Sequence, residues 1–193
     1  MAGITDGGGR RGVSWRIIGW GGAAALLLVP LIAMQFTNEV NWTGSDFVFA
    51  GVMLGALGLG IELAVRASRR AAYRLGALLA LGASFMLVWI NGAVGIIGSE
   101  GEGANLMFLG VIAVALVGSV IAGFRAGGMA WAMGAAAVAQ LLVPVVAPSV
   151  FPPSDPAMVW APEMIGSTGV FTAIWLLAAG LFRRAAQDET AAR

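Results

Sequence analysis

Few side chains in this sequence could do acid–base, nucleophilic or metal chemistry, because the chain contains no Lys, His or Cys. The absence of Cys and His excludes iron–sulfur clusters, thiolate zinc sites and Ser-His-Asp triads. The absence of Lys excludes a Schiff base and a P-loop lysine. Ten carboxylates, the hydroxyls and the single Tyr73 remain. They form no recognisable catalytic set, and we therefore expect neither an enzyme nor a bound cofactor.

Polar side chains inside apolar stretches are the next candidates for function. Asn91 and Gln140 lie within long apolar runs, where an amide must find a hydrogen-bonding partner. One interpretation is a pair of hydrogen bonds between helices. The other is a small polar pocket that opens outward, with Trp89 as one wall.

Glu62 lies near the end of an apolar run, four residues before Arg66. Acid before base at this spacing favours an ion pair on one helix face. The alternative is a proton or cation relay, because an ionisable residue at membrane depth is often functional.

Acidic and amide residues also mark the starts of three apolar runs. Asp46, Asn105 and Glu163 occupy these positions, where a short polar side chain can accept backbone N–H bonds and favour the helix dipole. As a group they could instead form an outer acidic surface for a hard cation, together with Glu39, Glu100 and Glu102. No EF-hand spacing is present, so we expect a solvated acidic surface and no metal site.

The elements that position these residues are predicted to be transmembrane helices. Of the 193 residues, 59% are hydrophobic and only 11% are charged, well below the quarter or so typical of soluble domains. Spanning a bilayer takes about 20 apolar residues. The sequence has six such runs, at 17–36, 46–65, 75–97, 105–124, 128–147 and 164–182. They predict an all-α six-helix bundle at 16–184, a tight hairpin at 125–127 and an irregular proline-rich cap at 148–163.

Arginine placement predicts the orientation of the bundle. With six spans, every arginine falls on one side: Arg10, Arg11, Arg16, Arg66, Arg69, Arg70, Arg74, Arg125, Arg183, Arg184 and Arg193. We therefore expect both termini in the cytoplasm, with tails at 1–15 and 185–193, and a multi-pass protein of a bacterial inner membrane. The first run is interpreted as a retained helix. A net charge of +1 gives no basic face for nucleic acid.

The chain also resembles itself at a shift of 58–59 residues. Trp15, Tyr73 and Trp131 recur at this interval near the starts of alternate helices. Three tandem two-helix hairpins would produce this pattern, but so would hairpins of equal length and similar composition. Small residues four apart, such as Gly51 and Gly55, favour close helix packing, either internally, with a membrane-protein partner or in a homo-oligomer.

Two segments carry a resemblance to a protein family. Asn41-Trp42-Thr43 with Asp46-Phe47, and Asn91 with the segment Ala93 to Glu100, are similar to segments of uncharacterised small multi-pass bacterial membrane proteins. The family pattern continues with Asp-Asn-Pro where this chain has Gly101-Glu102-Gly103. The resemblance implies a bacterial polytopic membrane protein and supplies no activity.

These observations predict a non-catalytic subunit or scaffold of a membrane assembly, in contact with the lipid bilayer. The alternative is a small transporter or channel for a cation or a small polar solute, with Asn91, Gln140 and Glu62 along its path.

Overall fold

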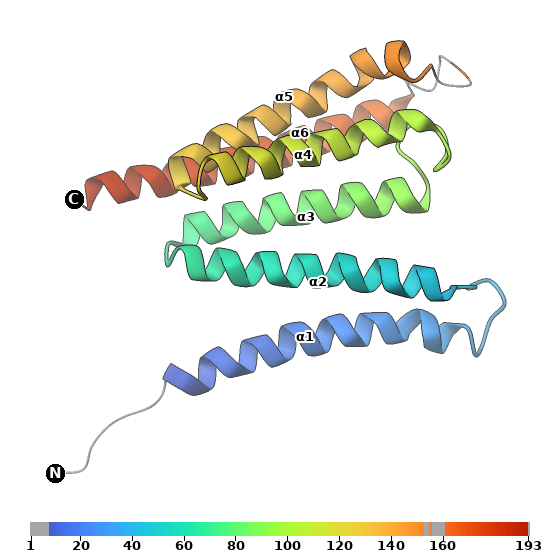
Figure 1. The fold of residues 1–193 in the computed structure, drawn as a ribbon, viewed down its shortest axis with the longest axis horizontal. Coiled ribbons are helices and arrows are strands. Elements are labelled where there is room, and N and C mark those ends of the chain that lie inside the picture. Colours follow the sequence, from blue (N-terminus) through green and yellow to red (C-terminus); the bar gives the residue numbers. More distant parts are fainter. Residues whose placement is uncertain (1–7, 153–154, 156–160, 193) are drawn as a thin grey trace. The chain divides into compact units, whose positions relative to one another are not determined.

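The computed structural model describes residues 8–152, 155 and 161–192, with side chains from Trp15 onward. These residues form helices and no strand: α1 (Gly8–Ala33), α2 (Gly44–Ala67), α3 (Ala71–Ala93), the short 3-10 helix η1 (Gly103–Asn105), α4 (Leu106–Ile121), α5 (Ala126–Val150) and α6 (Pro162–Ala191). Figure 1 shows their order. Six helices are long and apolar enough to cross a membrane, as predicted, and their apolar surfaces suit contact with lipid.

Several predicted boundaries are wrong, two of them for a clear local reason. The third run ends at Ala93 instead of 97, because Gly95 adopts a left-handed φ of 76° and its N–H bonds back to Ile90. The irregular segment predicted at 148–163 is shorter, because α5 continues through Pro148 to Val150 and α6 begins with Pro162 at a position suited to proline. Residues 153–154 and 156–160 of that segment lie outside the described residues, as do 1–7 of the predicted tail. At the other end, helix α6 continues through 185–191.

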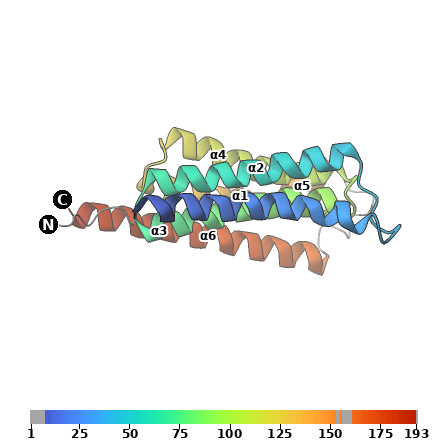
Figure 2. The same cartoon turned by 90° about the horizontal axis from the view of Figure 1, so that it is seen from below.

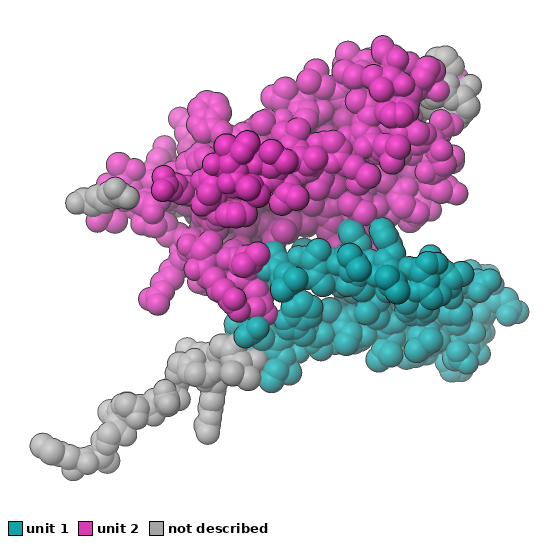
Figure 3. Space-filling model, in the orientation of Figure 1, with its two compact units in different colours: residues 1–60 teal, residues 61–193 magenta. Residues whose placement is uncertain are grey.

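The chain divides into two compact units, residues 1–60 and 61–193, coloured separately in Figure 3. Unit 1 contains α1 and most of α2. Unit 2 contains the end of α2 and the helices α3 to α6. Each unit is described by itself below.

In unit 2, α6 packs against both α3 and α5, and α4 packs against α5. Helices α3 and α4 meet at only a few positions, and Figures 1 and 2 show the four helices running side by side. The buried positions of α6 alternate at spacings of four and three residues, which is the knobs-into-holes period of helix bundles. The positions in this pattern are Met164, Thr168, Phe171, Trp175, Ala178, Phe182 and Ala185, and Thr172 is buried as well.

The α4–α5 hairpin is packed through residues without side-chain bulk. A Cβ on Gly118 would lie 2.8 Å from the Cβ of Ala132, and one on Gly128 would lie 2.5 Å from the Cβ of Ala122. The turn between the helices contains Phe124, whose φ is 57°. The predicted tight hairpin is therefore present, but its turn lies at 122–125 instead of 125–127, because α4 ends at Ile121 and α5 begins at Ala126.

In unit 1, α1 and α2 meet through large side chains that rest on glycines. The indole of Trp20 lies over Gly58, where an added Cβ would be 3.0 Å from the ring. A Cβ added to Gly51 would be 4.0 Å from the side chain of Leu27. Seven residues separate the contacts on each helix, so these two contacts fix one antiparallel register. The α1–α2 hairpin packs large side chains on glycines, whereas the α4–α5 hairpin packs glycines against alanines. The predicted hairpin repeat therefore stays a prediction.

The close approach of α4 and α5 predicts a sharp difference between two glycines of one helix. Gly118→Ala would overpack the interface and cost about 1–3 kcal/mol, so the midpoint of thermal unfolding in detergent should fall. Gly110→Ala is the matched control, because nothing lies within 4 Å of the added Cβ. Equal midpoints for the two variants would contradict the described packing.

Candidate functional site

At the end of unit 2 where α3 connects to α4, one buried amide side chain makes four hydrogen bonds to the backbone of the connecting loop. The Oδ1 atom of Asn105 accepts hydrogen bonds from the N–H groups of Ile96 and Ile97, at 3.1 and 2.9 Å. Its Nδ2 donates to the carbonyl oxygens of Ile97 and Ser99, at 3.1 and 2.7 Å. Asn105 is only 6% exposed. Its side chain therefore supplies the partners that the backbone of this loop lacks.

The predicted helix-capping role of Asn105 is wrong, because its side chain makes no capping bond to α4. In α6 the N-cap is Ala161, which makes no side-chain capping bond, and Glu163 lies in the first turn. Asp46 does cap: its Oδ2 accepts from the N–H and the hydroxyl of Thr43, at 2.7 and 2.8 Å. This is the reciprocal half of a capping box at the start of α2. The difference arises because the loop before Asn105 folds back over it.

The predicted outer acidic surface has no metal-binding cluster among the described residues, which contain no group of three or more acidic side chains close enough to hold an ion. Glu39, Asp46 and Glu100 are exposed and Glu102 is half-buried. Glu39 and Asp46 belong to unit 1, whereas Glu100 and Glu102 belong to unit 2. A shared acidic surface stays a prediction.

Near the C-terminal end of α2, Glu62 forms the ion pair with Arg66 that their four-residue spacing predicts. The carboxylate Oε2 accepts a bond of 3.1 Å from Arg66, and the two side chains are 8% and 67% exposed respectively. Arg74 donates to the carbonyl oxygens of Val65 and Ser68 at the end of α2, at 3.1 and 2.8 Å. The ion-relay role of Glu62 stays a prediction.

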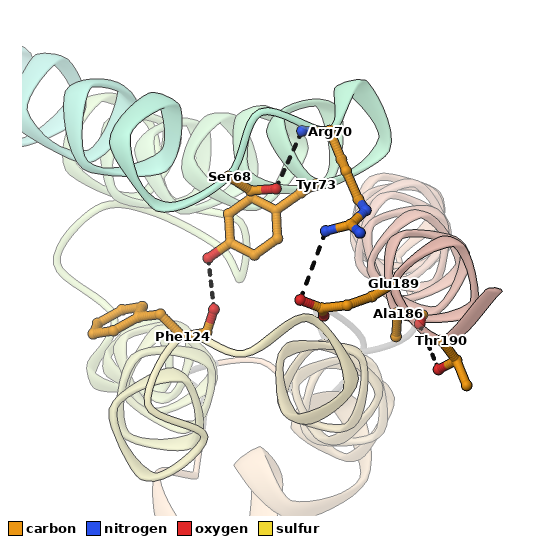
Figure 4. A network of polar contacts seen from close by, with 7 residues as sticks. All are labelled: Ser68, Arg70, Tyr73, Phe124, Ala186, Glu189 and Thr190. Atoms are coloured by element: carbon orange, nitrogen blue, oxygen red, sulfur yellow. Dashed lines mark hydrogen bonds and ion pairs between the residues drawn. The ribbon is translucent and has the colours of Figure 1, made fainter. Parts of the chain in front are cut away.

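Polar contacts at this same end join distant parts of unit 2, as Figure 4 shows. The Tyr73 hydroxyl at the start of α3 donates a 2.8 Å bond to the carbonyl of Phe124 in the α4–α5 turn. Arg70 lies 3.6 Å from the carboxylate of Glu189, close to the end of α6. These contacts fix the ends of α3, α5 and α6 relative to one another. Because Arg70 and Glu189 pair with each other, we interpret these contacts as structural.

The middle of unit 2 holds polar atoms of a different kind. Gln140 on α5 is completely buried, and neither its Nε2 nor its Oε1 has a hydrogen-bonding partner. The Thr172 hydroxyl and the Trp175 indole N–H on α6 are likewise buried without a partner. Sequence reasoning missed Thr172 and Trp175. For Trp175 the signal was present, because it lies on the four-and-three pattern of α6, whereas Thr172 is buried one residue after Phe171 and outside that pattern.

The other two residues of the predicted pocket lie on α3. Asn91 donates a 2.6 Å bond to the carbonyl of Leu87, and its Oδ1 is buried without a partner. Trp89 stacks on Phe85, with ring centroids 5.9 Å apart. No described contact joins either residue to Gln140, and the shared pocket stays a prediction.

Comparisons of the chain with family models, with curated proteins and with solved structures gave no match. Function must therefore be argued from the residues described above.

The Asn105 contacts predict that this side chain holds the 94–102 loop closed. Asn105→Ala should leave four backbone groups without their partner, and a Glu-specific protease added to purified protein should cleave after Glu100 or Glu102 at least five times faster. Ser99→Ala is the matched control, because Ser99 contributes its backbone carbonyl to this network. Wild-type cleavage rates in Asn105→Ala would show that the loop does not depend on the amide.

Proposed function

We propose that the protein is a non-catalytic subunit or scaffold of a bacterial inner-membrane assembly, and that helix α1 packs against a transmembrane helix of a partner protein. The observation that carries the proposal is the contrast between α1 and unit 2. Among the described side chains of α1 only Pro30 is buried, whereas α3, α4, α5 and α6 each bury a continuous stripe. The resemblance of its segments to uncharacterised multi-pass bacterial proteins supports only the bacterial, multi-pass part of this proposal.

Exposure of apolar side chains alone does not require a partner, because lipid tails are as apolar as leucine. The glycines of α1 supply the stronger argument. Gly21 and Gly22 have nothing within 4 Å of an added Cβ. On the helix, Gly22 lies opposite Trp20 and Leu27, and Gly21 lies to one side of them. Each glycine inside a helix costs about 1 kcal/mol relative to alanine. A helix that approaches closely over small residues can offset that cost through van der Waals contact.

Orientation is part of the same proposal. With six spans, both termini lie in the cytoplasm, and the acidic loop at 99–102 lies outside. The α2–α3 connection, with Arg69 and Arg70, then lies inside.

A second candidate function is transport of a cation or a small polar solute. It is favoured by the burial of Glu62 and of the unpartnered Gln140 amide within apolar helices. A path of this kind would use Glu62, Asn91 and Gln140.

Docking through α1 predicts a stable partner that depends on its glycine face. Purification in a mild detergent should recover a second membrane protein in fixed stoichiometry with the wild-type chain. Gly21→Leu/Gly22→Leu should reduce that recovery at least five-fold, because the larger side chains hold the partner helix away.

The matched control is Gly110→Leu on α4, which also has open space at its Cβ and should retain the partner. Recovery of the wild-type chain alone, or equal loss in both variants, would contradict docking through α1.

The proposed orientation predicts opposite labelling of two engineered cysteines, since the chain has none of its own. Gly101→Cys should react with a membrane-impermeant maleimide on intact cells. Ser68→Cys should react only after the cells are opened. Labelling of Ser68→Cys on intact cells would reverse the topology.

Transport predicts a loss of flux in two variants. Glu62→Gln and Asn91→Ala should each lower ion or solute uptake by proteoliposomes more than ten-fold, with equal protein incorporation as the control. Flux that is absent from wild-type vesicles, or unchanged in both variants, would remove this candidate.

A further inference from the structure

We infer that unit 2 binds water at the middle of its helix bundle, between Gln140 of α5 and the pair Thr172 and Trp175 of α6. This inference is independent of the proposed function, because it concerns only unit 2. It rests on four buried polar atoms without a partner: Nε2 and Oε1 of Gln140, the Thr172 hydroxyl oxygen and the Trp175 indole nitrogen.

The packing register places these three side chains at one depth. Gly127 at the start of α5 lies against Ala186 of α6, where an added Cβ would be 4.0 Å from the alanine Cβ. The helices run antiparallel, so thirteen residues further along α5 and thirteen back along α6 bring Gln140 level with position 173. Thr172 and Trp175 lie within about 3 Å of that level along the axis, at 1.5 Å per residue.

The chemistry of the three side chains is complementary to a neutral molecule. The amide and the hydroxyl can each donate and accept, whereas the indole only donates. No charged residue lies near this depth on the packed helices: α4 and α5 contain none, α3 has only Arg74 near its start, and α6 carries its charges at its two ends. An ion bound here would have no compensating charge, which makes binding of a cation or an anion costly.

Water is the smallest molecule that can serve all of these groups. A buried water makes about three hydrogen bonds, typically to protein groups that would otherwise lack partners. Such groups are especially costly inside a bilayer, because lipid tails offer none. Ala136 is buried one helical turn from Gln140 on α5, and Ala80 and Ala83 are buried on α3.

Hydroxyl-radical footprinting of the full chain in lipid nanodiscs tests the inference, with water itself as the probe. Radiolysis of a bound water produces radicals that react only with side chains beside it. Trp175 is 0% exposed, and it should nevertheless be oxidised at least five times faster than Met133, which is 2% exposed and lies two helical turns from Gln140 on α5. Both side chains are readily oxidised, so the difference measures the water.

The double variant Gln140→Leu/Thr172→Val keeps the Trp175 reporter and removes the other partners. Oxidation of Trp175 should fall at least five-fold in it, while a thermal unfolding curve shows that the variant is folded. Protection of Trp175 equal to that of Met133 in the wild-type protein would overturn the inference, because the three side chains would then bond to one another directly. Unchanged oxidation in the folded double variant would also overturn it.

Discussion

The structure depends on one constraint: the hydrocarbon interior of a membrane offers no hydrogen-bonding partners and no hydrophobic gain when two helices meet. Helices can then associate only through close van der Waals packing and through polar groups that satisfy one another. Unit 2 uses both. The α4 and α5 backbones approach at Gly118 and Gly128, and α6 presents a regular stripe toward α3 and α5.

The same constraint separates the roles of the polar residues. Asn105 makes the hydrogen bonds that the backbone of the 94–102 loop needs. Tyr73 bonds the start of α3 to the α4–α5 turn, and Glu62 pairs with Arg66. These side chains build the fold. The buried polar atoms of Gln140, Thr172 and Trp175 have no hydrogen-bonding partner among the described residues, which is why they point to a bound molecule. Helix α1 poses the equivalent question for packing, since Gly21 and Gly22 meet no side chain of unit 1.

Much of the fold could be predicted from the sequence, because apolar runs of about 20 residues report directly on spanning helices. The Glu62–Arg66 pair was predictable for the same local reason, since it depends on spacing within one helix. The role of Asn105 was not, because it depends on a loop that folds back after Gly95. Thr172 and Trp175 escaped notice because their importance depends on the depth at which α5 packs on α6.

The central claim, that α1 is the surface for a partner helix, is tested most directly by labelling from the lipid phase. A carbene-generating lipid would be photolysed in native membranes and in vesicles that contain only the purified chain. The account predicts that Gly21, Gly22 and their neighbours on α1 are labelled in the vesicles and protected at least five-fold in native membranes, while the exposed face of α4 is labelled equally in both. Equal labelling of α1 in the two preparations would contradict it.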